Sequence, residues 1–416
     1  MRKLILSALV FIPMIALSQN NSVIDWDADL NFLKVELPKN HINLYHLKSE
    51  KDFFDGIDQI SKEKNQLSNL EIAIQLQQLI ASFGDSHTMV GWGQFLDNNK
   101  ILPLNLMWFK DGLYVMNSTE ENQSILGDKI LKINGQPLAV IADSLKSLMT
   151  VDNNAVIKNS LPGLIRYAQV LQHFGFIKTD TIDLLLENQS GEVLNYVLKP
   201  GVLTRQNRKS FVPDSIALCY KNGKSLFVDS ILRKDNAYYI QYNLCNSREF
   251  PPQGFKGNPE LLPSFNDFKK KVIENINSHD FDKFIFDIRF NGGGNSAPGT
   301  ELIRELSAIK SINQKGKIYV VIGGQTFSSA IINAMDFKNM TAAIFVGEET
   351  SGKPNHFGEI KQLGLPGSGL KIYYSTKYFH DSAQDLKTIT PDQIIEPSFK
   401  DFKNGTDPIY DWIVKQ

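Results

Sequence analysis

A serine at a predicted strand-to-helix junction is the residue best placed to do chemistry in this sequence. The apolar run Lys317–Ile322 predicts a strand and Ile331–Met335 predicts a helix, and Ser328 lies between them, just after a pair of glycines. A hydroxyl at such a junction is exposed above the sheet and close to unpaired helix N-terminal amides, as an acyl-transfer nucleophile requires. The alternatives are that Ser328 only caps the helix, or that Ser329 is the nucleophile.

A serine hydroxyl is a weak nucleophile until a base removes its proton, and the sequence offers two candidate bases. His87 lies in the segment Asp85-Ser86-His87-Thr88, and an imidazole is basic near neutral pH without special surroundings. Lys353 follows Ser328 by 25 positions, but a lysine becomes a base only when burial lowers its pKa from about 10.4. We favour His87, with Ser86 as a candidate to orient its ring. The acidic partner stays open among Glu348, Glu349, Glu359 and Glu396.

A glycine-rich turn provides another part that acyl transfer needs. The run Phe284–Ile288 predicts a buried strand, and Gly292-Gly293-Gly294 follow shortly after it. Glycines let the backbone approach another group closely, so this turn can present amides to the charge of a tetrahedral intermediate. A tight turn with no chemical role is the alternative. A phosphate-binding loop is disfavoured, because neither a P-loop nor a dinucleotide fingerprint is present.

These residues belong to three motifs that stand in one order. They read Asp287-x-Arg289-x-Asn291-Gly292-Gly293-Gly294, then Gly323-Gly324-x-Thr326-Phe327-Ser328-Ser329-Ala330, then Gly347-Glu348-x-Thr350-x-Gly352-Lys353. The combination closely resembles the serine peptidases of the C-terminal processing (tail-specific) family, which includes the tricorn core protease, the nisin resistance protein and the non-catalytic interphotoreceptor retinoid-binding protein. The resemblance implies an α/β fold with a ClpP/crotonase-like core, a PDZ-like domain and a helical N-terminal segment.

The resemblance also implies roles for the candidate site residues. Ser328 matches the reactive serine of the family, and the amides of Gly293, Gly294 and Ser329 would form the oxyanion hole. The segment with His87 resembles the one that supplies the histidine in the tricorn and nisin resistance branches, whereas the position of Lys353 resembles the Ser-Lys dyad of the bacterial enzymes. No cofactor is implied. We expect His356, close to Lys353, to pack or to contact substrate.

The remaining pattern predicts the domain organisation. Residues 1–18 carry a basic start, an apolar run and a small-residue cleavage site, which predict a signal peptide, an exported protein and no membrane span after cleavage. We predict a helical segment over 19–96, in which Ser68-Asn69-Leu70-Glu71 is a capping box. A polar linker over 200–214 leads into a protease core over 201–416, with closing strands predicted at Lys371–Tyr374 and Ile394-Ile395. Residues 97–200 are predicted to be a PDZ-like domain, because Gly127–Leu138 resembles the PDZ core, with helices inserted over Asp152–Phe176.

The amino-acid composition limits the classes of binding partner that the chain can have. The chain has 416 residues, 44 basic and 45 acidic side chains and a formal charge of −1, so there is no electrostatic case for binding nucleic acid. The 7 histidines and 2 cysteines are scattered without ligand spacing, so no metal site is expected, and Cys219 and Cys245 are either bridged or free. We expect a peptide or protein substrate for a serine endopeptidase. The alternative is a non-catalytic peptide- or lipid-binding protein, and the oligomeric state stays open.

Overall fold

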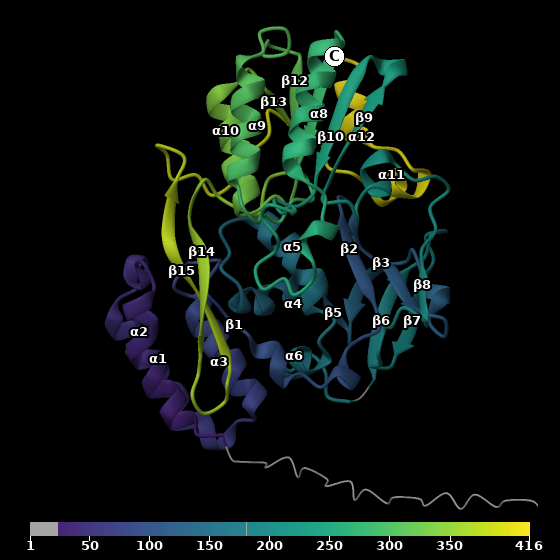
Figure 1. Ribbon diagram of the computed structural model, residues 1–416. Coiled ribbons are helices and arrows are strands. Elements are labelled where there is room, and N and C mark those ends of the chain that lie inside the picture. Colours follow the sequence, from purple (N-terminus) through teal and green to yellow (C-terminus); the bar gives the residue numbers. More distant parts are fainter. Residues whose placement is uncertain (1–23, 180) are drawn as a thin grey trace, which may run out of the picture.

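The computed structural model describes residues 24–179 and 181–416, so the predicted signal peptide lies outside the described residues. The described strands form three β-sheets. Figure 1 shows β9 to β13 with α8 to α10 at the top, β14 and β15 beside α1 to α3 at the lower left, and β2, β3 and β6 to β8 at the lower right. No helix among the described residues is both long and apolar enough to span a membrane. Cys219 and Cys245 are both buried and free, so the open question of a disulfide is answered in favour of two thiols.

The largest apolar core surrounds a six-stranded sheet with the order β16-β13-β12-β11-β10-β9, in which every neighbouring pair is parallel except β10 and β9. Helices α8 to α10 cover one face of this sheet and α12 covers the other, so the strands are buried on both faces. The strands are β9 (Phe227–Leu232), β10 (Ala237–Tyr242), β11 (Lys283–Asp287), β12 (Ile318–Ile322), β13 (Ile344–Gly347) and β16 (Gln393–Ile394). The helices are α8 (Phe265–Ser278), α9 (Ala297–Ala308), α10 (Ser329–Met340) and α12 (Pro408–Ile413).

A second sheet has the order β2-β3-β4-β6-β7, with β5 beside β4 and β8 beside β3. Its apolar face packs on the helices α4 to α6. The predicted linker was wrong in part, because β8 lies inside it and pairs with β3 in antiparallel orientation; a polar edge strand of three residues has no periodicity to reveal it. The elements are β2 (Asn105–Phe109), β3 (Gly112–Thr119), β4 (Lys129–Ile133), β5 (Gln136–Pro137), α4 (Leu138–Leu145), α5 (Asn154–Leu164), α6 (Ala168–His173), β6 (Ile182–Glu187), β7 (Val193–Leu198) and β8 (Arg208–Ser210).

The third sheet, with the order β1-β15-β14, joins two segments that lie far apart in the chain. A hairpin of β14 (Asn355–Gly364) and β15 (Lys371–His380) lies along the N-terminal helices α1 (Trp26–Asn40), α2 (Glu50–Glu63) and α3 (Asn69–Ala81), as both views show. The short strand β1 (Met89–Val90) pairs with β15. We expected Lys371–Tyr374 to close the core sheet, and this was wrong, because β15 pairs only with β14 and β1 among the described strands. Strand pairing is non-local and leaves no local signal.

Helix ends follow the sequence closely. Ser68 and Glu71 form the predicted capping box at the start of α3, where the Ser68 hydroxyl accepts from the Glu71 amide and the Glu71 carboxylate accepts from the Ser68 amide. Helix α3 ends at Ala81, and Gly84 then takes a φ of +84°, which turns the chain toward the segment with His87. The two short helices still unnamed are α7 (Leu218–Lys221) and α11 (Phe399–Asn404).

Candidate active site

Ser328 is held in a strained turn between β12 and α10. Its φ of 53° and ψ of −123° lie in a region that non-glycine residues rarely occupy, and such strain is typical of a nucleophile at a strand-to-helix turn. The turn is fixed by Thr326, whose hydroxyl donates to the Ile288 carbonyl at 2.9 Å and accepts from the Gly323 amide at 3.1 Å. The Phe327 amide donates to the Asn291 carbonyl, so the nucleophile turn is tied to the glycine-rich turn beside it.

The structure brings His87 to Ser328, although 241 positions separate them. Nε2 of His87 lies 3.0 Å from the Ser328 hydroxyl oxygen. His87 is only 3% exposed, and this burial lowers its pKa to about 4 in spite of the nearby Asp85 carboxylate. The imidazole is therefore neutral near pH 7, with a lone pair available for the hydroxyl proton. The contact has the geometry of a nucleophile and its base.

Asp85 is the carboxylate nearest in sequence to His87, but it binds the backbone rather than the ring. Asp85 accepts from the His87 amide at 2.8 Å and from the Thr88 hydroxyl at 2.6 Å. Nε2 of His41 donates to it at 2.9 Å, and the proton lies on this nitrogen because Nδ1 of His41 accepts from the Asn43 amide. Burial alone would raise the pKa of Asp85, but these hydrogen bonds outweigh it, so the carboxylate stays charged.

The four glutamates considered as acidic partners do not bind His87. No hydrogen bond among the described residues joins His87 to Glu348, Glu349, Glu359 or Glu396; Glu396, for example, pairs with Lys158 at 2.8 Å. The Ser86 side chain likewise makes no hydrogen bond with the described part of the chain. The sequence reasoning missed Asp85 and its partner His41. Asp85 stood in the quoted motif, whereas nothing in the spacing points to His41, which lies 44 positions away.

Lys353 lies in an ion pair and makes no hydrogen bond with Ser328. Its Nζ is 2.6 Å from a carboxylate oxygen of Asp152, and both side chains are largely buried. The next residue, Asn153, donates to the carbonyls of Thr350 and Lys387, so the loop before α5 is fastened to the loop that carries Lys353. The Lys353 ammonium is therefore directed at Asp152 and not at Ser328, which does not suit a general base for this hydroxyl.

The glycine-rich turn passes directly beside Ser328. Gly293 has a φ of +109°, and a Cβ built there would stand 2.8 Å from the Ser328 Cβ, so only glycine fits. The Gly293 amide donates to the Asn291 side chain at 2.9 Å. The amides of Gly294 and Ser329 donate to no acceptor within the described residues, which leaves these two of the three predicted donors free to bind an oxyanion.

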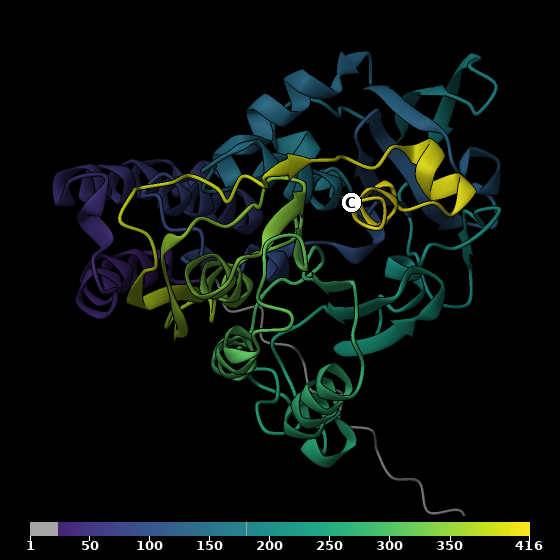
Figure 2. The same cartoon turned by 90° about the horizontal axis from the view of Figure 1, so that it is seen from above.

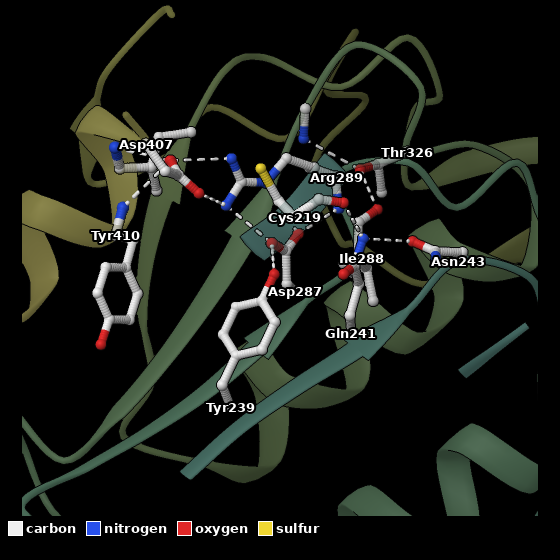
Figure 3. A network of polar contacts seen from close by, with 12 residues as sticks. Cys219, Tyr239, Gln241, Asn243, Asp287, Ile288, Arg289, Thr326, Asp407 and Tyr410 are labelled. Carbon is white, nitrogen blue, oxygen red and sulfur yellow. Dashed lines mark hydrogen bonds and ion pairs between the residues drawn. The ribbon is translucent and has the colours of Figure 1, made fainter. Parts of the chain in front are cut away.

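A buried charge cluster surrounds Arg289, which precedes the glycine-rich turn in the chain (Figure 3). The guanidinium of Arg289 lies between two carboxylates, with Nη2 at 2.8 Å from Asp287 and 2.9 Å from Asp407. Tyr239 donates to Asp287 at 2.6 Å. Asp407 also accepts from two amides at the start of α12, so the cluster fastens the end of β11 to the C-terminal helix. Burial alone would raise the pKa of Asp407, but Arg289 holds it below its usual range.

Two cavities flank these turns. One, of about 260 Å³, lies between β2, α5 and the turn just before the nucleophile, where Gly324 and Gln325 line it. The other, of about 820 Å³, is lined by Gly84 before the His87 segment and by Lys353 and Asn355 after the nucleophile helix. Both are large enough to receive side chains of a polypeptide.

Comparisons with known proteins concern the fold and one segment of the chain. Residues 261–395, which include the glycine-rich turn, Ser328 and Lys353, match the sequence profile of peptidase family S41. No curated protein matches the chain in sequence. Mature CPAF, solved in complex with lactacystin, is similar in structure with a TM-score of 0.61 at 13% identity, over 94% of this chain and 96% of that one. Because the identity is so low, this likeness shows a common fold.

Two further solved structures match less closely. The photosystem II D1 C-terminal processing protease has a TM-score of 0.41 at 11% identity, over 92% of this chain and 97% of that one. The tricorn protease has a TM-score of 0.41 at 14% identity, over 94% of this chain and 36% of that one. The profile match over residues 261–395 identifies the chain as a serine-type peptidase, which is a hydrolase.

Proposed function

We propose that the protein is an exported endopeptidase of the tail-specific type that cleaves polypeptides through Ser328. Its hydroxyl oxygen attacks the carbonyl carbon of the scissile bond while Nε2 of His87 takes the hydroxyl proton. Nε2 then gives this proton to the leaving amine. In the second half of the reaction His87 takes a proton from the attacking water and returns one to Ser328, which frees the enzyme. The amides of Gly294 and Ser329 hold the oxyanion. The observation that carries the proposal is the 3.0 Å contact between His87 and the strained Ser328.

The wider organisation is part of the same proposal. We infer that the six-stranded sheet and its helices are a ClpP/crotonase-like core and that the second sheet with α4 is a PDZ-like module. Residues 1–18 would be a signal peptide and direct export to the periplasm or outside. The cavity between β2 and the turn before Ser328 supports a polypeptide substrate, because it joins the second sheet to the nucleophile turn.

Covalent labelling tests the proposal. The mature protein is incubated with a fluorophosphonate, and the modified residue is located by mass spectrometry. We expect one adduct on Ser328, its loss in Ser328→Ala, and labelling slowed at least a hundredfold in His87→Ala because the base is gone. Ser329→Ala and Lys353→Met are matched controls that should label at nearly the wild-type rate. A folded wild-type protein without an adduct would favour a peptide- or lipid-binding protein on this fold instead.

A further inference from the structure

Four aromatic rings form a column through the candidate active site. Phe327, next to the nucleophile, stacks on His87 with ring centroids 4.7 Å apart and planes 19° apart. His87 faces His356 at 5.6 Å and 22°, and His356 faces Phe379 at 5.2 Å and 23°. The ammonium of Lys377 lies 4.7 Å from the Phe379 centroid and closes the column. The plane of the His87 ring is therefore set by stacking on both sides.

His356 is a buried, neutral histidine whose tautomer follows from its surroundings. It is 4% exposed, and its Nδ1 lies 3.2 Å from the Pro354 carbonyl oxygen, which can only accept. The proton is therefore on Nδ1, and Nε2 carries a lone pair. This Nε2 is buried without a partner among the described residues. Burial lowers the pKa of His356, so the lone pair is present near pH 7.

Among the described residues, His87 has a buried nitrogen, Nδ1, that lacks an acceptor just as Nε2 of His356 lacks a donor. When its Nε2 accepts the proton of Ser328, its own proton lies on Nδ1, and this buried Nδ1 has no acceptor in the part of the chain that the structure describes. In a Ser-His-Asp triad a carboxylate accepts this bond. Here Asp85 is the nearby carboxylate, and its oxygens are taken by the His87 amide, Thr88 and His41. A buried donor and a buried acceptor without partners therefore lie on neighbouring rings of one column.

We propose that His356 is a positioning residue for His87, taking the place that a carboxylate holds in a Ser-His-Asp triad. Its ring fixes the plane of His87, and its Nε2 accepts, through one water, the hydrogen bond that starts at Nδ1 of His87. A water is required because the lone pairs of two nearly parallel rings do not point at each other. The proton from Ser328 goes to Nε2 of His87, while the Nδ1 proton stays on His87. Asp85, with His41 behind it, and Lys353 are the other charged or titratable groups that act on this pair.

This inference rests on the proposed function, and two substitutions separate stacking from hydrogen bonding. His356→Phe keeps the column and removes the acceptor, whereas His356→Gln keeps an acceptor and removes the aromatic ring. An unsatisfied buried donor corresponds to a loss of about tenfold to a hundredfold, so we expect His356→Phe to lower kcat by that factor with KM unchanged. The acid limb of its kcat/KM profile should move to lower pH, because protonated His87 loses its acceptor. His356→Gln should retain kcat within about tenfold of the wild type, a range taken from the same penalty.

The outcomes distinguish a wrong role for His356 from a wrong proposed function. His356→Phe with wild-type kcat and an unmoved acid limb would overturn the inference while wild-type labelling at Ser328 left the proposed function standing. No adduct on the wild type would instead remove the proposed function itself. If His356→Phe does not fold, nitrogen NMR of the wild-type imidazoles decides: we expect the proton on Nδ1 in both histidines, and a proton on Nε2 of His356 would contradict its role as an acceptor.

Discussion

Two buried polar clusters, one around Arg289 and one around His87, are built on different principles. In the cluster around Arg289, one positive charge faces two carboxylates at ion-pair distance. In the cluster around His87, the ring that faces Ser328 is kept neutral by burial and its second nitrogen has no partner among the described residues. Compensated charge stabilises the fold around Arg289, whereas a ring kept neutral by burial can take a proton on Nε2, the nitrogen that faces Ser328. The following changes test this division between a structural cluster and a reactive one.

The largest expected effect is the loss of the nucleophile. Ser328→Ala should lower kcat by about 10⁴-fold or more, because the remaining groups can only bind and polarise the substrate. Steady-state kinetics on a peptide substrate measures this. Urea unfolding should give nearly the wild-type free energy, since the hydroxyl contributes reactivity rather than support. A large fall in stability with residual turnover near the wild-type rate would reverse the assignment of the two clusters.

Removing the charge of Arg289 should lower the free energy of unfolding, which Ser328→Ala should leave nearly unchanged. Arg289→Met leaves Asp287 and Asp407 buried without a positive partner, and breaking such a pair costs about 3–5 kcal/mol of unfolding free energy. Chemical denaturation measures the loss. Lys387→Met is the matched control, because its pair with Asp385 is exposed and should contribute less than about 1 kcal/mol. Equal losses in the two variants would contradict the structural role of the Arg289 cluster.

The buried His87 makes both stability and activity depend on acid pH. Its pKa in the folded protein is about 4, below the ordinary value near 6.5, so folding favours the neutral ring. The stabilisation is fully present above pH about 6.5 and is lost as the pH falls through about 4, with a size on the order of 3 kcal/mol. Urea unfolding between pH 7.5 and 4 measures the slope, which His87→Gln should reduce. The acid limb of kcat/KM should lie near pH 4, and a limb near 6.5 would contradict the burial argument.

The strain at Ser328 predicts a smaller effect. Glycine adopts a positive φ without penalty, so Ser328→Gly should be more stable than Ser328→Ala by about 1 kcal/mol, although both lack the nucleophile. Thermal or chemical unfolding of the two variants measures the difference directly. Identical stabilities would mean that the turn relaxes when the serine is replaced.

The smallest effect is expected at Lys353. Because its ammonium pairs with Asp152, Lys353→Met should leave kcat within about tenfold of the wild type, far from the loss expected for a missing base. His87→Ala, measured in parallel, should lose at least a hundredfold. If Lys353→Met were the more damaging substitution, the lysine would be the base in a conformation that differs from this one.

Much of the fold could be predicted because its signals are local. The strand before Ser328, the helix after it and the capping box of α3 depend on neighbouring residues, and the structure confirms them. The pairing of β15 and the presence of β8 were mispredicted, because pairing depends on residues far away in the sequence. The three motifs indicated Ser328 and the glycine-rich turn. They could not indicate that the Gly293 amide is taken by Asn291, since that depends on one side-chain rotamer.

The sequence by itself determined that Ser328 lies in a tight turn, since the strand before it, the two glycines and the helix after it all have local signals. It also determined the choice of two bases, but not which one reaches the serine. The tertiary structure decided this: His87, in the segment after the N-terminal helices, lies 3.0 Å from the Ser328 hydroxyl, and Lys353 pairs with Asp152, just before α5. The protonation state of His87 also depends on the tertiary structure, because burial changes the pKa and the hydrogen-bond partners of a ring. The local sequence does not determine how deeply that ring is buried.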